Sequence, residues 1–158
     1  MFTERNKMMQ ERLNFANVSP NALKAMLEVE KFAATSGLEP TLYELVKIRN
    51  SQINGCAFCL DMHTKDARKA GETEQRLYAL SAWRETPFYT GRERAALEWT
   101  EALTLISENN VPDSIYDSVR RQFDEKELVC LTMAVIAING WNRLAISFRT
   151  VPGTYQPN

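Results

Sequence analysis

The sequence has little net charge, which argues against a polyanionic partner. Nineteen Lys and Arg residues nearly balance twenty Asp and Glu residues, so the formal net charge is −1. So small a charge produces no long-range field that would gather DNA or RNA. We therefore expect no nucleic acid as a partner.

The sequence also lacks the segments that are typical of secreted and membrane proteins. Its first residues, MFTERNKMMQERLNFANVSP, carry charges throughout and contain no apolar stretch of the kind found in a secretory signal. The longest apolar run, Leu128–Ile138, is too short to cross a hydrocarbon core of about 30 Å and is better explained as a buried helix. These features predict a cytoplasmic protein with no membrane as a partner.

Cysteine is scarce, with three residues in the chain. This number does not suggest a structural disulfide framework, because thiols in a reducing compartment stay reduced unless they turn over in catalysis. Cys130 lies in the apolar segment LVCLTMAVIAI, where a free thiol packs as a small hydrophobe. We expect the three tryptophans to be core or subunit-contact anchors as well, namely Trp83, Trp99 and Trp141.

No run alternates apolar and polar residues over the length of a strand, whereas signals for helix starts and ends recur along the chain. The sequence therefore predicts an all-α fold, a bundle of about seven helices in a single domain over residues 1–158. The core should cover about residues 20–148, and the Pro- and Gly-containing tail at 150–158 should be irregular. Helices are expected at about 21–36, 41–53, 54–71, 71–83, 90–106, 113–123 and 124–148, with capping boxes at Thr90–Glu93 and Asp124–Glu127.

Two cysteines and the only histidine of the chain cluster in the segment NGCAFCLDMH. If a helix begins at Asn54 or Gly55, Cys56 lies in its first turn, and Cys59 and His63 follow one and two turns later. At about 100° per residue, the three side chains fall within an arc of about 60° on a single face of this central helix. A helix N-terminus and an imidazolium both stabilise a thiolate, and sulfurs one turn apart can close into a disulfide. The pattern favours a redox pair.

Other interpretations of this cluster remain open. A zinc ion could use the same side chains, with a fourth ligand from elsewhere: Cys56, Cys59 and His63, with Glu44 or Cys130. The chain has no further C-x-x-C or H-x-x-H pair, which a structural zinc site usually contains. A c-type haem is excluded, because Leu60 stands where its histidine ligand would be. Packing in the core is the remaining alternative.

The cluster and an upstream glutamate resemble a known signature. Glu44 precedes Cys56 by twelve residues, and Cys59 and His63 follow. This arrangement is similar to the Glu…Cys-x-x-Cys-x-x-x-His pattern of the alkylhydroperoxidase D-like (AhpD-like) proteins, within the carboxymuconolactone decarboxylase superfamily. The likeness covers about residues 20–82.

The later segment WNRLAI, residues 141–146, resembles one that is common in the peroxidase-related branch of these proteins. The mycobacterial type carries a second histidine between its cysteines, whereas this chain has Ala57 and Phe58 there. The resemblance implies an all-α fold, assembly into trimers or hexamers, and a thiol peroxidase or disulfide reductase activity that needs no cofactor.

Carried over to this chain, the family pattern implies a role for each residue of the signature. Cys59 would be the thiol that attacks the peroxide, and Cys56 would be its disulfide partner. Glu44 and His63 would form a proton relay. The partners implied are a hydroperoxide substrate and a dithiol electron donor.

We weigh two other classes of function beside this one. A helical oligomer could use the same cysteines to sense redox state or to bind zinc without catalysis. Lactone decarboxylation is the weakest reading, since it does not require a C-x-x-C pair. Asp61 and Lys65 should point to solvent on the opposite face of the helix and take no part in the chemistry.

Overall fold

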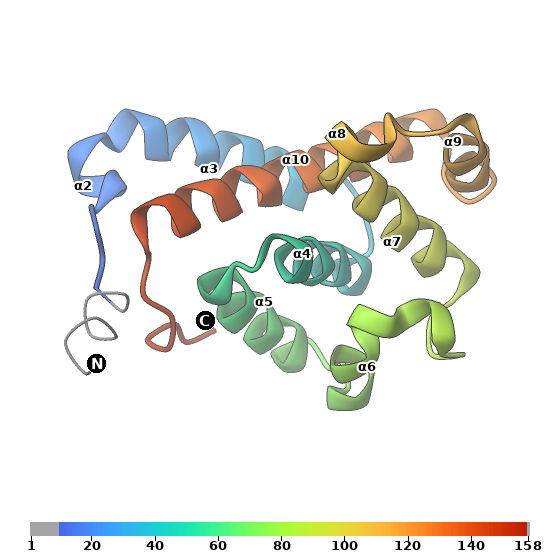
Figure 1. Ribbon diagram of the computed structural model, residues 1–158, viewed down its shortest axis with the longest axis horizontal. Helices are drawn as coiled ribbons and strands as arrows, with labels where there is room; N and C mark the ends of the chain where they lie inside the picture. Colours follow the sequence, from blue (N-terminus) through green and yellow to red (C-terminus); the bar gives the residue numbers. More distant parts are fainter. Residues whose placement is uncertain (1–9, 158) are drawn as a thin grey trace.

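The computed structural model describes residues 10–157, and every regular element in that range is a helix. The first nine residues of the charged N-terminal segment, with Met8 and Met9, and Asn158 lie outside the described residues. The elements, labelled as in Figure 1, are α2 (Phe15–Val18), α3 (Pro20–Ala34), α4 (Pro40–Asn54), α5 (Ala57–Lys69), α6 (Glu74–Ala79), the 3₁₀ helix η1 (Leu80–Glu85), α7 (Gly91–Thr104), α8 (Ile106–Asn109), α9 (Asp113–Arg120) and α10 (Glu125–Phe148). The predicted all-α fold class is confirmed.

The helix starts follow the capping signals in the sequence. Thr90 and Glu93 form a complete capping box at the start of α7, and Asp124 and Glu127 form another at the start of α10. The predicted set of about seven helices did not include α2 and α8. Each has a single turn, which is too short to show a hydrophobic period.

Helix α10, with 24 residues, is the longest helix of the described part of the chain. It lies beside α3 along one edge of the molecule, and α4 and α7 also pack on it (Figure 1). Its length and mean hydropathy would allow it to cross a membrane. One face of it forms part of the protein core, because Leu131, Ala134, Ala137 and Ile138 are fully buried. The expectation of a buried helix at this position is confirmed.

A network of buried amides fixes the end of α4 against α10. The side-chain amide of Asn54 donates to the side-chain oxygens of Asn50, Asn139 and Asn142 at 2.9–3.1 Å. The chain then reverses at Gly55, whose φ of +70° is in the left-handed region that favours glycine. This turn leads directly into α5 and therefore sets the position of the cysteine pair.

The tail after α10 is irregular and runs back along α5 (Figure 1). The backbone N–H of Gly153 donates to Asp61 at 3.0 Å, and Lys65 donates to the carbonyl oxygen of Tyr155 at 2.9 Å. Asp61 and Lys65 also pair with each other at 2.9 Å. These two residues, which we expected to be solvent-facing, hold the tail in place.

Candidate functional site

The cysteine pair lies at the start of α5. Helix α4 continues through Asn54, and Cys56 is the N-cap of α5. The predicted helix start at Asn54 or Gly55, with Cys56 in the first turn, is therefore wrong by two to three residues, because the left-handed turn at Gly55 separates the two helices. Cys56 and Cys59 form a disulfide with their Cα atoms 5.4 Å apart, and both residues are buried.

The N-cap position gives Cys56 a specific electrostatic environment. Its Sγ accepts a hydrogen bond from the backbone N–H of Cys59 at 3.3 Å. A sulfur at this position faces the unpaired N–H groups and the positive end of the helix dipole. Negative charge on Cys56 after the disulfide opens is therefore stabilised by the backbone of α5.

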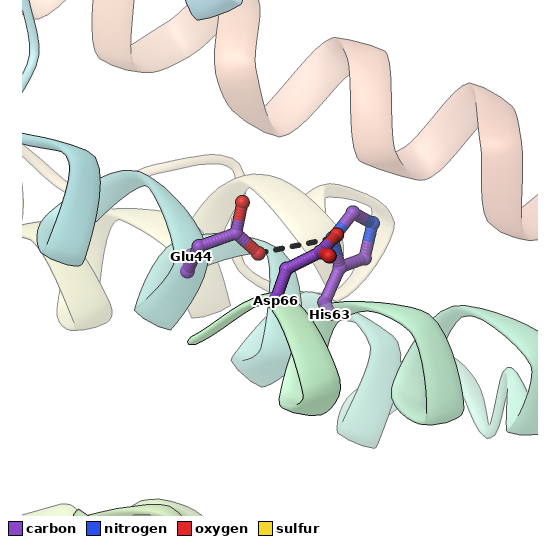
Figure 2. A group of neighbouring side chains, drawn as sticks. All are labelled: Glu44, His63 and Asp66. Atoms are coloured by element: carbon purple, nitrogen blue, oxygen red, sulfur yellow. Dashed lines mark hydrogen bonds and ion pairs between the residues drawn. The ribbon is translucent and has the colours of Figure 1, made fainter. Parts of the chain in front are cut away.

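The histidine of the site is held by the predicted glutamate. Nδ1 of His63, on α5, lies 3.0 Å from Oε2 of Glu44, on α4 (Figure 2). His63 is 7% exposed, and the side chain of Glu44 is 17% exposed. With Nδ1 bonded to the carboxylate, the ring orientation is fixed and Nε2 is left for a second partner. His63 follows Cys59 by four residues, so the two side chains lie on the same face of α5.

A second carboxylate, which the sequence did not single out, completes this group. Asp66 lies one turn beyond His63, and one oxygen or nitrogen of each of Glu44, His63 and Asp66 lies within 4.8 Å of the others (Figure 2). The hydroxyl of Tyr155, in the tail, donates to Asp66 at 2.7 Å. This hydrogen bond, burial and the charges of Asp66 and Glu44 raise the pKa of Tyr155 to about 12, so its phenol stays protonated at neutral pH. The i, i+3 spacing of His63 and Asp66 could have indicated this neighbour from the sequence. The contact of Asp66 with Tyr155 in the tail could not be predicted in this way.

The predicted zinc ligands do not assemble into one set. Both sulfurs of the pair are in the disulfide, and Cys130 is a free buried thiol on α10. Among the described residues, the potential metal ligands that come within reach of one another are Glu44, His63 and Asp66, without a cysteine. These side chains could hold a cation through oxygen and nitrogen. Each of them already has a hydrogen-bond partner in the protein.

An apolar cavity of about 340 Å³ opens beside Cys59 and His63. We call it the Cys59 cavity, and its lining consists of Phe15, Leu27, Glu30, Phe58, Cys59, Met62, His63, Trp141, Ala145 and Thr150. Cys56 lines a neighbouring surface groove with Val151 and Pro152 instead. Of the tryptophans expected to be anchors, Trp83 and Trp99 are buried, whereas Trp141 forms part of the cavity wall.

Trp141 is fixed in this wall by a buried ionic network. Its indole N–H donates to Oε2 of Glu30 at 3.0 Å, while the hydroxyl of Tyr43 donates to Oε1 at 2.8 Å. Lys47 forms an ion pair with the same carboxylate. Sequence analysis missed this network, because its members come from α3, α4 and α10.

The chain is similar to known proteins over most of its length. Residues 20–102 match the carboxymuconolactone decarboxylase family. The uncharacterized protein YdfG of Bacillus subtilis is 49% identical over 88% of this chain and 95% of its own length. The crystal structure of ATU0492 from Agrobacterium tumefaciens, a protein of unknown function with a suggested assignment as the antioxidant defence protein AhpD, is 44% identical. It matches 92% of this chain and 100% of its own with a TM-score of 0.90.

A more distant structure shares the fold. An uncharacterized peroxidase-related protein from Silicibacter is 21% identical and has a TM-score of 0.74 over 84% of this chain and 70% of its own. The matching residues 20–102 contain Glu44, both cysteines of the pair and His63. On this match and on its AhpD-like fold, the chain belongs to the carboxymuconolactone decarboxylase family, among its AhpD-like members.

Proposed function

We propose that the protein is a cofactor-free thiol peroxidase that reduces hydroperoxides through Cys56 and Cys59. The observation that carries the proposal is the position of the Cys56–Cys59 disulfide, which lies at a cavity that also exposes a histidine oriented by Glu44. A redox pair, a group that can move protons and room for a substrate therefore meet at one place. The family membership and the likeness to an AhpD-like structure support the same chemistry.

The oxidative half of the proposed cycle begins with the reduced pair. His63, oriented by Glu44, takes the thiol proton of Cys59, and the thiolate attacks the O–O bond of a hydroperoxide. The bond breaks, the distal oxygen stays on sulfur as a sulfenic acid, and the proton goes to the departing alkoxide to give an alcohol. The thiol of Cys56 then displaces water from the sulfenic acid and closes the disulfide.

The reductive half uses an external dithiol. One thiolate of the donor attacks Sγ of Cys59 and releases Cys56 as a thiolate, which the helix N-terminus stabilises. The second donor thiol then attacks the mixed disulfide and leaves Cys59 reduced. The sum is one hydroperoxide and one dithiol converted to one alcohol, one water and one donor disulfide. A reducing compartment such as the cytoplasm supplies donors of this kind.

The other classes have weaker support. A redox sensor would use the same disulfide but has no need for a substrate cavity beside it. A lactone decarboxylase would have no use for a cysteine pair of which Cys59 lines this cavity. We also propose that the protein works as a homo-oligomer, a trimer or a hexamer, as the resemblance implies.

The test is hydroperoxide consumption with dithiothreitol as the electron donor. We expect Cys59→Ser and Cys56→Ser to lose turnover to the background rate, and His63→Gln to lose about a hundredfold or more, the usual contribution of a general base. Cys130→Ala is the matched control, because it removes a buried thiol outside the site and should leave the rate unchanged. Turnover that persists in all three site variants would rule out this function.

A further inference from the structure

The Cys59 cavity has walls that suit a carbon-rich substrate. Phe58 and Met62 flank Cys59 on α5, and Trp141 and Ala145 face them from α10. At about 340 Å³, the cavity is in the size range of sites for organic molecules and far larger than hydrogen peroxide requires. A hydroperoxide with an apolar body would therefore bury its apolar surface against these side chains, while its O–O group contacts the sulfur of Cys59.

The apolar wall contains an acidic side chain, that of Glu30. The carboxylate of Glu30 lines the cavity, and its side chain is 23% exposed. Burial by itself would raise the pKa of Glu30, but the charge of Lys47 and hydrogen bonds from Lys47, Tyr43 and Trp141 lower it below its ordinary value. Glu30 is therefore ionised at neutral pH, and the negative member of its ion pair with Lys47 is the one that lines the cavity.

Among the described residues, no lysine or arginine faces the cavity in a position to hold an anion. Lys47, the ion-pair partner of Glu30, is not part of the lining; 5% of its side chain is exposed, and its ammonium lies 4.0 Å from the ring centre of Tyr43. The indole N–H of Trp141 already donates to Glu30. His63, which also lines the cavity, is bonded to the carboxylate of Glu44. An anion in the cavity would lose its hydration without gaining a lysine or arginine as a partner.

We infer that the Cys59 cavity selects organic hydroperoxides with an uncharged, apolar body and rejects those that carry a carboxylate, with Glu30 as the residue that sets the charge preference. The inference rests on the proposed function, because it assigns the substrate class of the same site. The atoms balance as in the oxidative half-reaction above, and the product is an uncharged alcohol.

The test compares two substrates that share one skeleton and differ in charge, one with a carboxylate and one with its methyl ester. Cumene hydroperoxide carrying a para-carboxylate is compared with the methyl ester of the same molecule, with dithiothreitol as the donor. We expect kcat/KM to be at least about tenfold higher for the ester, because an unpaired carboxylate is costly to desolvate. Equal values for the acid and the ester would overturn the inference and leave the peroxidase function standing.

The double variant Glu30→Gln/Lys47→Met tests whether Glu30 sets the charge preference. It removes the wall charge together with its buried partner, so no unpaired ammonium remains. We expect the advantage of the ester to fall to about threefold or less, since the charge that disfavours the acid is gone. The matched control is Lys24→Met/Glu28→Gln, which removes one exposed charge of each sign from the same helix α3. An unchanged preference in the cavity variant would overturn the role of Glu30.

A binding measurement separates failure of the inference from failure of the proposed function. The product analogue 2-phenyl-2-propanol and its para-carboxylate are titrated against the intrinsic fluorescence of the protein, with Trp141→Phe as the blank. Preferential binding of the uncharged alcohol supports the selectivity even if no hydroperoxide is consumed, a result that would overturn the peroxidase function alone. Equal binding of both compounds, or of neither, would overturn the selectivity.

Discussion

The chemistry proposed here depends at the residue scale on how two side chains are held. Cys56 is the N-cap of α5, so its sulfur faces backbone N–H groups, and His63 has one ring nitrogen tied to Glu44. The first contact favours the thiolate of Cys56, and the second fixes the ring so that its other nitrogen can exchange a proton at Cys59. Neither arrangement requires a metal ion.

Replacement of Glu44 by glutamine tests the orienting role. The amide keeps the shape of the side chain but removes its charge, so His63 is held less firmly and an imidazolium is no longer stabilised. We expect kcat for the hydroperoxide to fall about tenfold or more, with little change in KM, because Glu44 does not line the cavity. The control is Glu74→Gln on α6, which should leave kcat unchanged. An unaltered kcat in Glu44→Gln would show that the pair at 3.0 Å has no part in the rate.

The ion pair of the partly buried Glu30 and the buried Lys47 predicts a pH dependence of stability. The pKa of Glu30 is lowered in the folded chain from its ordinary value of 4.5, despite the opposing effect of burial. Its contribution to the free energy of unfolding is therefore present above about pH 4.5 and is lost as the pH falls through the folded-state pKa. We expect wild type to lose more stability between pH 6 and pH 3, measured by urea unfolding, than Glu30→Gln/Lys47→Met. If both proteins lost the same free energy of unfolding between pH 6 and pH 3, the ion pair would not be the source of the pH dependence.

At the element scale, the turn between α4 and α5 positions the cysteine pair, with Cys59 at the cavity. Amides from α4 and α10 fix the end of α4, and Gly55 reverses the chain with a positive φ. An added Cβ at Gly55 would meet no atom within 4 Å, so a substitution there changes backbone strain and little else. The site therefore depends on a single left-handed residue.

Gly55→Ala measures that dependence. We expect a loss of about 1 kcal/mol in the free energy of unfolding, the usual difference between alanine and glycine in the left-handed region. The control is Gly91→Ala at the start of α7, where a Cβ would lie 3.8 Å from Gln122 and no positive φ is involved. That variant should be neutral or slightly more stable. Equal effects at both positions would show that the turn at Gly55 carries no strain of this kind.

The sequence predicted elements better where local chemistry determines them. The capping boxes at Thr90 and Asp124 needed no knowledge of the fold, and each begins a helix. The start of α5 was predicted two to three residues early, because Asn54 and Gly55 fit a helix start as well as a helix end. Asp66 joins Glu44 and His63, and Trp141 joins Glu30, through contacts between distant segments. Periodicity along one helix contains no information on such contacts.

At the scale of the whole molecule, several large apolar side chains lie on the surface of the single chain. Val129 and Ile136 lie seven residues apart on α10, on the same face, and are 59% and 51% exposed. An exposed face of this kind on a core helix is typical of a subunit contact. It agrees with the oligomer that we propose.

Ile136→Glu tests that contact. A charge placed in a buried apolar interface should dissociate the oligomer, so light scattering after size exclusion should give the mass of one chain, 18.1 kDa, where wild type gives a multiple. Tyr78→Glu on α6 is the control, since Tyr78 is 72% exposed at a site away from α10 (Figure 1). A wild-type mass of 18.1 kDa would refute the oligomer.

The account as a whole depends on a pair of sulfurs that opens and closes once for each substrate consumed. The most direct measurement is a single turnover of the fully reduced protein with one equivalent of hydroperoxide, quenched with an alkylating reagent and analysed by mass spectrometry. We predict that Cys56 and Cys59 are both lost as free thiols while Cys130 stays alkylatable after denaturation, with one alcohol formed for each disulfide. Alcohol formed while both thiols remain free would contradict the account.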